Sequence, residues 1–210
     1  MHKGTVLNLK KFNSGINFVR KNWCVLILTV AFIIGIFIGT YGITKYDILI
    51  RFTEKLTENF IIIRCTDKFF SIFLNAFITN FIFLLLIFVF GTSVTGITLV
   101  PIIVGIKGFS LGSIISVVYS QYALKGIAFN ALIIIPPSVV TIIFIILFAK
   151  NAINLSLQII NITLPDSKPK NLSFGFKQYF NSFLLVLIPI IFTSILDAWL
   201  SVNFISYLDF

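Results

Sequence analysis

Histidine, cysteine and acidic residues are scarce in this chain of 210 residues. It contains one histidine, two cysteines and seven acidic residues. There is no Ser/His/Asp set, no HExxH motif and no glycine-rich phosphate-binding loop, so we expect a protein that is not an enzyme and needs no cofactor. Cys24 and Cys65 lie far apart without a CxxC spacing, and the one histidine is His2. We therefore expect isolated thiols and no metal site.

Charged residues are also few, whereas apolar residues dominate. Only 11% of the residues are charged, 58% are hydrophobic, 25 are phenylalanine, and the mean hydropathy is +1.06. Apolar runs of this length predict an all-α, polytopic membrane protein with about five transmembrane helices. The net charge of +9 comes from lysines and arginines that flank the apolar runs. We therefore expect contact with the lipid bilayer and no binding of nucleic acid.

The alternation of polar and apolar stretches divides the chain into six segments. They are a basic amphipathic segment (1–22), transmembrane helix 1 (23–43), an amphipathic extracytoplasmic segment (44–68), transmembrane helices 2 to 4 (69–149) with a loop at 119–126, a cytoplasmic interfacial segment (150–182), and transmembrane helix 5 with an outer C-terminus (183–210). A signal peptide is the alternative for the first apolar run. That run is too long and lacks a small-x-small cleavage site, so we expect a retained span.

Lysine and arginine residues predict the orientation in the membrane. With the N-terminus inside, the cytoplasmic segments hold nine of these residues and the outer segments hold six, which most of the acidic residues offset. The positive-inside rule therefore favours a cytoplasmic N-terminus and an extracytoplasmic C-terminus. The high content of Ile, Phe, Asn and Lys is typical of an AT-rich bacterial genome, so we expect a multi-pass protein of the bacterial cell membrane.

Glycine and proline occur at informative positions within the apolar runs. Small residues on one side of a membrane helix let a second helix approach closely. Two such sets are present: Gly35 and Gly39 in the first span, and Gly105, Gly108 and Gly112 in the third. The pair Pro136 and Pro137 stands in the fourth span, where it predicts a helix kink. A broken helix of the kind found in transporters is the alternative interpretation.

Two ionisable residues of opposite charge lie well inside the predicted spans. Lys107 is near the middle of the third span and Asp197 is in the fifth. Such charges are costly in a membrane unless they are paired, so we predict an intramembrane Lys107–Asp197 ion pair. At about 100° per residue, Thr193, Ser194 and Ser201 share the side of Asp197, which predicts a polar helix face. The pair is either a structural pin or part of a proton or ion relay.

The extracytoplasmic segment 44–68 combines charged residues with an apolar stripe. Its apolar positions recur at intervals of three or four residues, which indicates an amphipathic helix. The residues of the stripe are Ile48, Phe52, Leu56 and Phe60. This stripe either rests on the bilayer or forms a candidate docking face for a partner protein.

Three short motifs carry a resemblance to a known family. They are Gly105-Ile-Lys-Gly-Phe-Ser-Leu-Gly112, Asn130-Ala-Leu-Ile-Ile-Ile-Pro136 and Ile195-Leu-Asp-Ala-Trp199. With the order of a basic N-terminal stretch, one span, an amphipathic outer segment and four further spans, they resemble stage II sporulation protein M of endospore-forming bacteria. The resemblance covers nearly the whole chain.

This resemblance implies a function as well as a fold. It implies a non-catalytic membrane scaffold that localises or assembles peptidoglycan hydrolases at the septal membrane during engulfment. The implied partners are a membrane-anchored lytic transglycosylase and a peptidoglycan amidase/endopeptidase, and no small-molecule substrate is expected. A membrane subunit of a small-molecule or ion transporter or export system is the alternative. A lipid-modifying enzyme ranks third, because it would need a cluster of His, Asp or Glu at an interface.

Overall fold

A computed structural model describes residues 22–42, 60, 62–64, 68–163 and 172–208. Within these residues the chain is helical and contains no strand. The elements are the N-terminal helix Asn22–Gly42, α3 (Phe69–Gly91), α4 (Gly96–Phe129), the π-helical turn η1 (Asn130–Ile134), α5 (Ile135–Thr163) and α6 (Leu172–Leu208). Four stretches of the described residues are long and apolar enough to cross a membrane, and one of them, Gly96–Ile162, folds back on itself. The predicted all-α polytopic class is confirmed.

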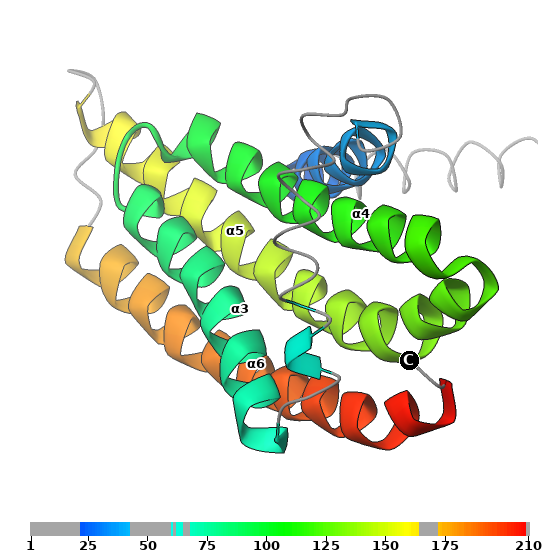
Figure 1. The fold of residues 1–210 in the computed structure, drawn as a ribbon. Helices are drawn as coiled ribbons and strands as arrows, with labels where there is room; N and C mark the ends of the chain where they lie inside the picture. Colours follow the sequence, from blue (N-terminus) through cyan, green and yellow to red (C-terminus); the bar gives the residue numbers. More distant parts are fainter. Residues whose placement is uncertain (1–21, 43–59, 61, 65–67, 164–171, 209–210) are drawn as a thin grey trace, which may run out of the picture.

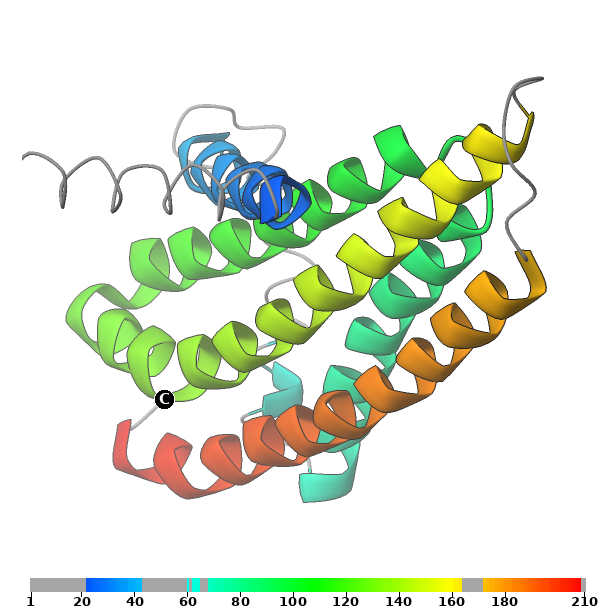
Figure 2. The same cartoon turned by 180° about the vertical axis from the view of Figure 1, so that it is seen from behind.

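The helices α3, α4, α5 and α6 lie side by side as a bundle, with the N-terminal helix on the outer side of α4 (Figures 1 and 2). Helix α5 packs against α3, α4 and α6, and α6 also packs against α3. The sides of these helices that face away from the bundle carry exposed apolar residues, for example Phe37, Ile188 and Phe192. Such a surface is suited to contact with lipid, because apolar side chains exposed to lipid carry no free-energy penalty.

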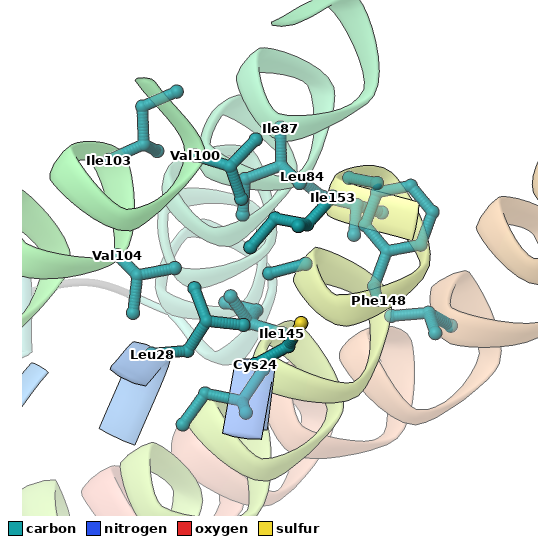
Figure 3. Packing of buried hydrophobic residues seen from close by; sticks show 14 of the residues in the cluster. Cys24, Leu28, Leu84, Ile87, Val100, Ile103, Val104, Ile145, Phe148 and Ile153 are labelled. Atoms are coloured by element: carbon teal, nitrogen blue, oxygen red, sulfur yellow. The ribbon is translucent and has the colours of Figure 1, made fainter. Parts of the chain in front are cut away.

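The core lies where the N-terminal helix, α3, α4 and α5 meet (Figure 3). Leu28, Leu84, Val104 and Ile145, one from each of these helices, are fully buried there. Toward the start of α6 the core becomes aromatic, because Tyr179 stacks between Phe88 and Phe148 with ring centroids 5.3 and 5.0 Å apart. The Tyr179 hydroxyl donates a hydrogen bond of 3.0 Å to the backbone oxygen of Ile87. Burial and this hydrogen bond together join α6 to α3.

The chain reverses direction within α4. Ala123 has φ 47° and ψ −119°, the single positive φ of a non-glycine residue among those described. Helix continues on both sides of this residue, so the predicted loop at 119–126 is reduced to a turn at one residue. Gly126 allows the tight return, because a Cβ there would collide with the backbone of Val118. The Asn130 amide nitrogen donates to the backbone oxygen of Ile115 at 3.1 Å across the turn.

The irregularity predicted at Pro136 and Pro137 takes the form of a π-helical turn just before them. The amide of Ile135 donates to the oxygen of Asn130, five residues back, and the prolines then occupy the first turn of α5. Because η1 leads into α5 without a break, each proline removes one backbone donor from a continuous helical path. The Pro137 oxygen accepts a 2.8 Å hydrogen bond from the Thr141 hydroxyl.

The predicted cytoplasmic interfacial segment 150–182 consists largely of helix. Residues 150–163 continue α5 and residues 172–182 begin α6, and both stretches pack against the bundle. Ser156 is fully buried and donates to the backbone oxygen of Gly91 at 3.1 Å. Asn151, Asn154 and Gln158 of α5 line a polar pocket together with Gln178 and Ser182 of α6. Their amphipathic spacing therefore reflects contact between two helices.

Candidate functional site

Asp197 lies on the buried side of α6. Its residue is 7% exposed, and the three polar residues predicted to share its side, Thr193, Ser194 and Ser201, are also buried. The Thr141 hydroxyl oxygen on α5 lies 2.9 Å from the Thr193 hydroxyl oxygen. On the opposite side of α6, Trp199 is 56% exposed. The structure thus places this polar face inside the bundle.

The direct partner of Asp197 is Arg64 rather than the predicted Lys107. The Arg64 Nη2 donates to the Asp197 Oδ2 at 2.5 Å, and Arg64 itself is only 6% exposed. The guanidinium also lies over the Phe60 ring, 3.4 Å from its centroid. Arginine suits such a place because its planar, weakly hydrated group pairs with carboxylates and stacks on aromatic rings.

Lys107 has a different first contact. Its Nζ donates to the Asn80 Oδ1 on α3 at 2.7 Å and lies 4.7 Å from the centroid of the Phe83 ring. Its interaction with Asp197 is electrostatic and acts over a longer range. The predicted Lys107–Asp197 ion pair between α4 and α6 is therefore replaced by two separate contacts. Arg64, from segment 44–68, pairs with the carboxylate, and the Asn80 amide on α3 accepts a hydrogen bond from the ammonium.

These contacts surround one cavity of about 110 Å³. Lys107, Asp197 and Arg64 all line it, and the remaining walls come from α3, α4 and α5. Its polar lining also includes Asn75, Thr79, Asn80, Ser110, Ser138, Thr141 and Thr193. A polar cavity of this volume has room for several water molecules, since one needs roughly 10–15 Å³. The site can hold water or a small charged group in the middle of an otherwise apolar bundle.

Sequence reasoning missed Arg64 and Asn80, although each leaves a signal. Arg64 continues the four-residue step of Leu56 and Phe60, so a charge stands on the apolar stripe of an amphipathic segment. A charge at that position indicates a buried partner. Asn80 is the central residue of the apolar helix α3, where a polar side chain requires a hydrogen bond.

The two glycine sets pack against each other. A Cβ at Gly35 or Gly39 would collide with the backbone of α4 at Gly105 or Phe109, and one at Gly108 or Gly112 would collide with the backbone of the N-terminal helix. Gly105 is less confined, because a Cβ there would lie 3.4 Å from the Ala31 oxygen. Both sets therefore serve one close helix contact.

Some predicted residues lie outside the described part of the chain. Ile48, Phe52 and Leu56 of the candidate docking stripe do so, as does Cys65, whereas Phe60 lines the polar cavity. Cys24 is described as a free, buried cysteine within the core. In the residues that the structure describes, no group of three His, Cys, Asp or Glu could hold a metal ion.

The three resemblance motifs each coincide with one of these features. Residues 105–112 carry the glycine contact and Lys107, residues 130–136 include the π-helical turn, and residues 195–199 hold Asp197. The sequence profile of stage II sporulation protein M matches residues 25–202. The chain belongs to the stage II sporulation protein M family. Comparison with curated proteins and with solved structures returned no match.

Membership of the stage II sporulation protein M family makes this a sporulation-related membrane protein. The matched region extends from the N-terminal helix almost to the end of α6, so it includes every helix that lines the cavity. The match therefore spans the whole bundle, including the positions of Arg64, Lys107 and Asp197.

Proposed function

We propose that this chain is a non-catalytic membrane scaffold that localises or assembles peptidoglycan hydrolases at the septal membrane during engulfment in endospore formation. The observation that carries the proposal is the family match over residues 25–202. The proposed partners are a membrane-anchored lytic transglycosylase and a peptidoglycan amidase/endopeptidase, as the family resemblance implies. The protein has a cytoplasmic N-terminus, so that its larger polar segment, 44–68, faces the cell wall.

The arrangement of charges supports a structural function. Asp197 pairs with Arg64, and Lys107 contacts Asn80, so each buried charge joins parts of the chain that are distant in sequence. The contact of Arg64 with Asp197 attaches the end of the extracytoplasmic segment to α6. A scaffold needs such attachment, because a docking segment has to be held in a fixed position relative to the membrane.

The test is affinity purification of the tagged protein in mild detergent from cells at the onset of sporulation. We expect both wall hydrolases to co-purify, and we expect the double variant Ile48→Asp/Phe52→Asp to lose them because it places charges on the apolar stripe. The variant Glu54→Gln, on the polar side of the same segment, serves as the control. Absence of both hydrolases, together with normal engulfment in a deletion strain, would refute the proposal.

A transporter or export subunit is the second candidate, and the polar cavity is the observation that favours it. A transporter would show substrate-dependent flux through the bundle. The flux should fail when the cavity is altered without breaking the Arg64–Asp197 pair, for example by Ser138→Leu or Thr79→Leu. Loss of hydrolase localisation without any flux would leave the scaffold as the function.

A further inference from the structure

We propose that the polar pocket between α5 and α6 binds the headgroup of an anionic phospholipid. The pocket has a volume of about 380 Å³, and its polar lining consists of Asn151, Asn154 and Gln158 of α5 with Gln178 and Ser182 of α6. The end of α5 and the start of α6, which carry these residues, lie at the same end of the bundle (Figures 1 and 2). Binding of a lipid there is independent of the proposed scaffold function.

The pocket lies at the level of the lipid headgroups. Helix α3 has 23 residues and is about 35 Å long, so its two ends lie near the two boundaries of a hydrocarbon core about 30 Å thick. Its last residue, Gly91, accepts a hydrogen bond of 3.1 Å from the Ser156 hydroxyl on α5. Asn154 and Gln158 lie two residues before and after Ser156, which is about 3 Å along the helix. Their amides are therefore at the depth of phosphate and glycerol groups.

Nearer the middle of the membrane, the same sides of both helices expose apolar residues. Leu147 and Ile143 lie seven and eleven residues before Asn154, which puts them on its side of α5, and both are exposed. Leu185 lies seven residues after Gln178, on the same side of α6, and is also exposed. The surface is thus polar at the headgroup level and apolar at greater depth. A phospholipid has this same order of polar and apolar groups.

The chain is positively charged where it adjoins this end of the bundle. Residues 150–182 contain four lysines and one acidic residue, and residues 1–21 contain five lysines and arginines and no acidic residue. Lys150 donates a hydrogen bond of 3.4 Å to Asn22, which begins the N-terminal helix, so both segments join the bundle at this end. The other six acidic residues are Asp197, Asp209 and the four of segment 44–68. Basic residues concentrated near a membrane surface favour anionic lipids.

Lys177 lies beside the pocket on the exposed surface of α6. With Gln178, which also lines the pocket, it borders a second hollow of about 410 Å³ beside the exposed rings of Phe174 and Phe180. An ammonium next to the amides adds a charge-assisted hydrogen bond to a phosphate, and such bonds are stronger than those between neutral groups. The site therefore combines amide donors, a cation and apolar rings, which together suit an anionic headgroup and the start of its acyl chains.

Native mass spectrometry of the full-length protein released from nanodiscs tests this proposal. The nanodiscs contain equal parts of phosphatidylglycerol and phosphatidylcholine, which share the phosphate group but differ in net charge. We expect retention of phosphatidylglycerol in preference to phosphatidylcholine. Asn154→Leu/Gln178→Leu should reduce the retained phosphatidylglycerol about tenfold, and Lys177→Gln about fivefold. The matched controls Asn203→Leu and Lys125→Gln, at exposed residues outside both hollows, should leave it unchanged.

Photo-crosslinking identifies the occupant of the pocket in membranes of cells that produce the full-length protein. A photo-crosslinking amino acid at Asn151 should form adducts with anionic phospholipid. The control position is Ile143, which is exposed on α5 about 12 Å deeper and should form adducts with phospholipids of any headgroup. Equal retention of the two lipids, retention unchanged in the pocket variants, or crosslinks from position 151 only to another protein would overturn the proposal.

Discussion

At the scale of residues, the Arg64–Asp197 contact is a buried ion pair with a measurable coupling. Removing one partner leaves an uncompensated buried charge, so Arg64→Met and Asp197→Asn should each destabilise the protein by about 3 kcal/mol or more. The double variant should cost less than the sum, because neither member of the Arg64–Asp197 pair is then left without the other. Unfolding in detergent by a denaturant titration gives these values, and additive costs would contradict a direct pair.

The same measurement distinguishes the two cations. The coupling of Lys107→Met with Asp197→Asn should be smaller than that of Arg64→Met with Asp197→Asn, because Lys107 acts on the carboxylate only at longer range. Lys107→Met should instead couple with Asn80→Leu, since the two side chains share a 2.7 Å hydrogen bond. A stronger coupling of Asp197 to Lys107 than to Arg64 would restore the pair expected from the sequence.

A second residue-scale prediction concerns Tyr179. Tyr179→Phe removes the hydrogen bonds to the backbone oxygens of Ile87 and Phe88 but keeps the stacked ring, so it should destabilise the bundle by about 1 kcal/mol. The control is Tyr119→Phe, because Tyr119 is exposed and its change should stay within about 0.5 kcal/mol. Equal effects of the two changes in thermal unfolding would exclude a role for the hydrogen bonds.

The sequence allowed the buried charges to be located but not paired. Lys107 and Asp197 stood out because they interrupt apolar runs, and the side of α6 that carries Asp197 followed from the 100° spacing alone. Their partners depended on which helices are neighbours. Helix α4 meets α6 over few residues, whereas α3 lies against both. Asn80, on α3, is therefore a nearer partner for Lys107, and the signals at Asn80 and Arg64 did not show which residue each would contact.

At the scale of elements, the glycine contact between the N-terminal helix and α4 makes a graded prediction. A Cβ at Gly108 or Gly112 would collide with a backbone oxygen of the facing helix, whereas one at Gly105 would be at ordinary contact distance. We expect Gly108→Ala and Gly112→Ala to cost about 1–3 kcal/mol each and Gly105→Ala to be nearly neutral. Thermal unfolding of the three variants checks this, and equal costs would contradict the register.

Helix positions were predictable from hydropathy, whereas the ends and irregularities of the helices were not. The apolar runs predicted the N-terminal helix, α3 and the first half of α4 close to the positions that these helices have in the structure. The sequence predicted a loop at 119–126 but not that helix continues up to a reversal at Ala123, and α5 and α6 extend beyond their apolar parts because Ser156 and Tyr179 donate hydrogen bonds to the backbone of α3. Contacts between distant helices determine such features, and one sequence does not display them.

At the scale of the whole molecule, the fold fixes which helix ends lie on the same side. Contacts between the N-terminal helix and α4 advance in the same direction, from Ala31 with Gly105 to Thr40 with Ser116, so the two helices are parallel. The C-terminal end of α6 lies at the same end of the bundle as the turn at Ala123 (Figure 1). The positive-inside rule then predicts that this end is extracytoplasmic.

Cysteine labelling tests that orientation. In a chain with Cys24 and Cys65 replaced by alanine, Leu124→Cys and Val94→Cys introduce thiols at positions that are 81% and 48% exposed, one at the reversal within α4 and one just before α4 begins. A membrane-impermeant maleimide should label the thiol at position 124 in intact cells and the one at position 94 only after lysis. The reverse labelling pattern would show that the protein has the opposite orientation in the membrane, with segment 44–68 in the cytoplasm. A docking face there could not reach hydrolases at the cell wall, so this result would also refute the proposed scaffold.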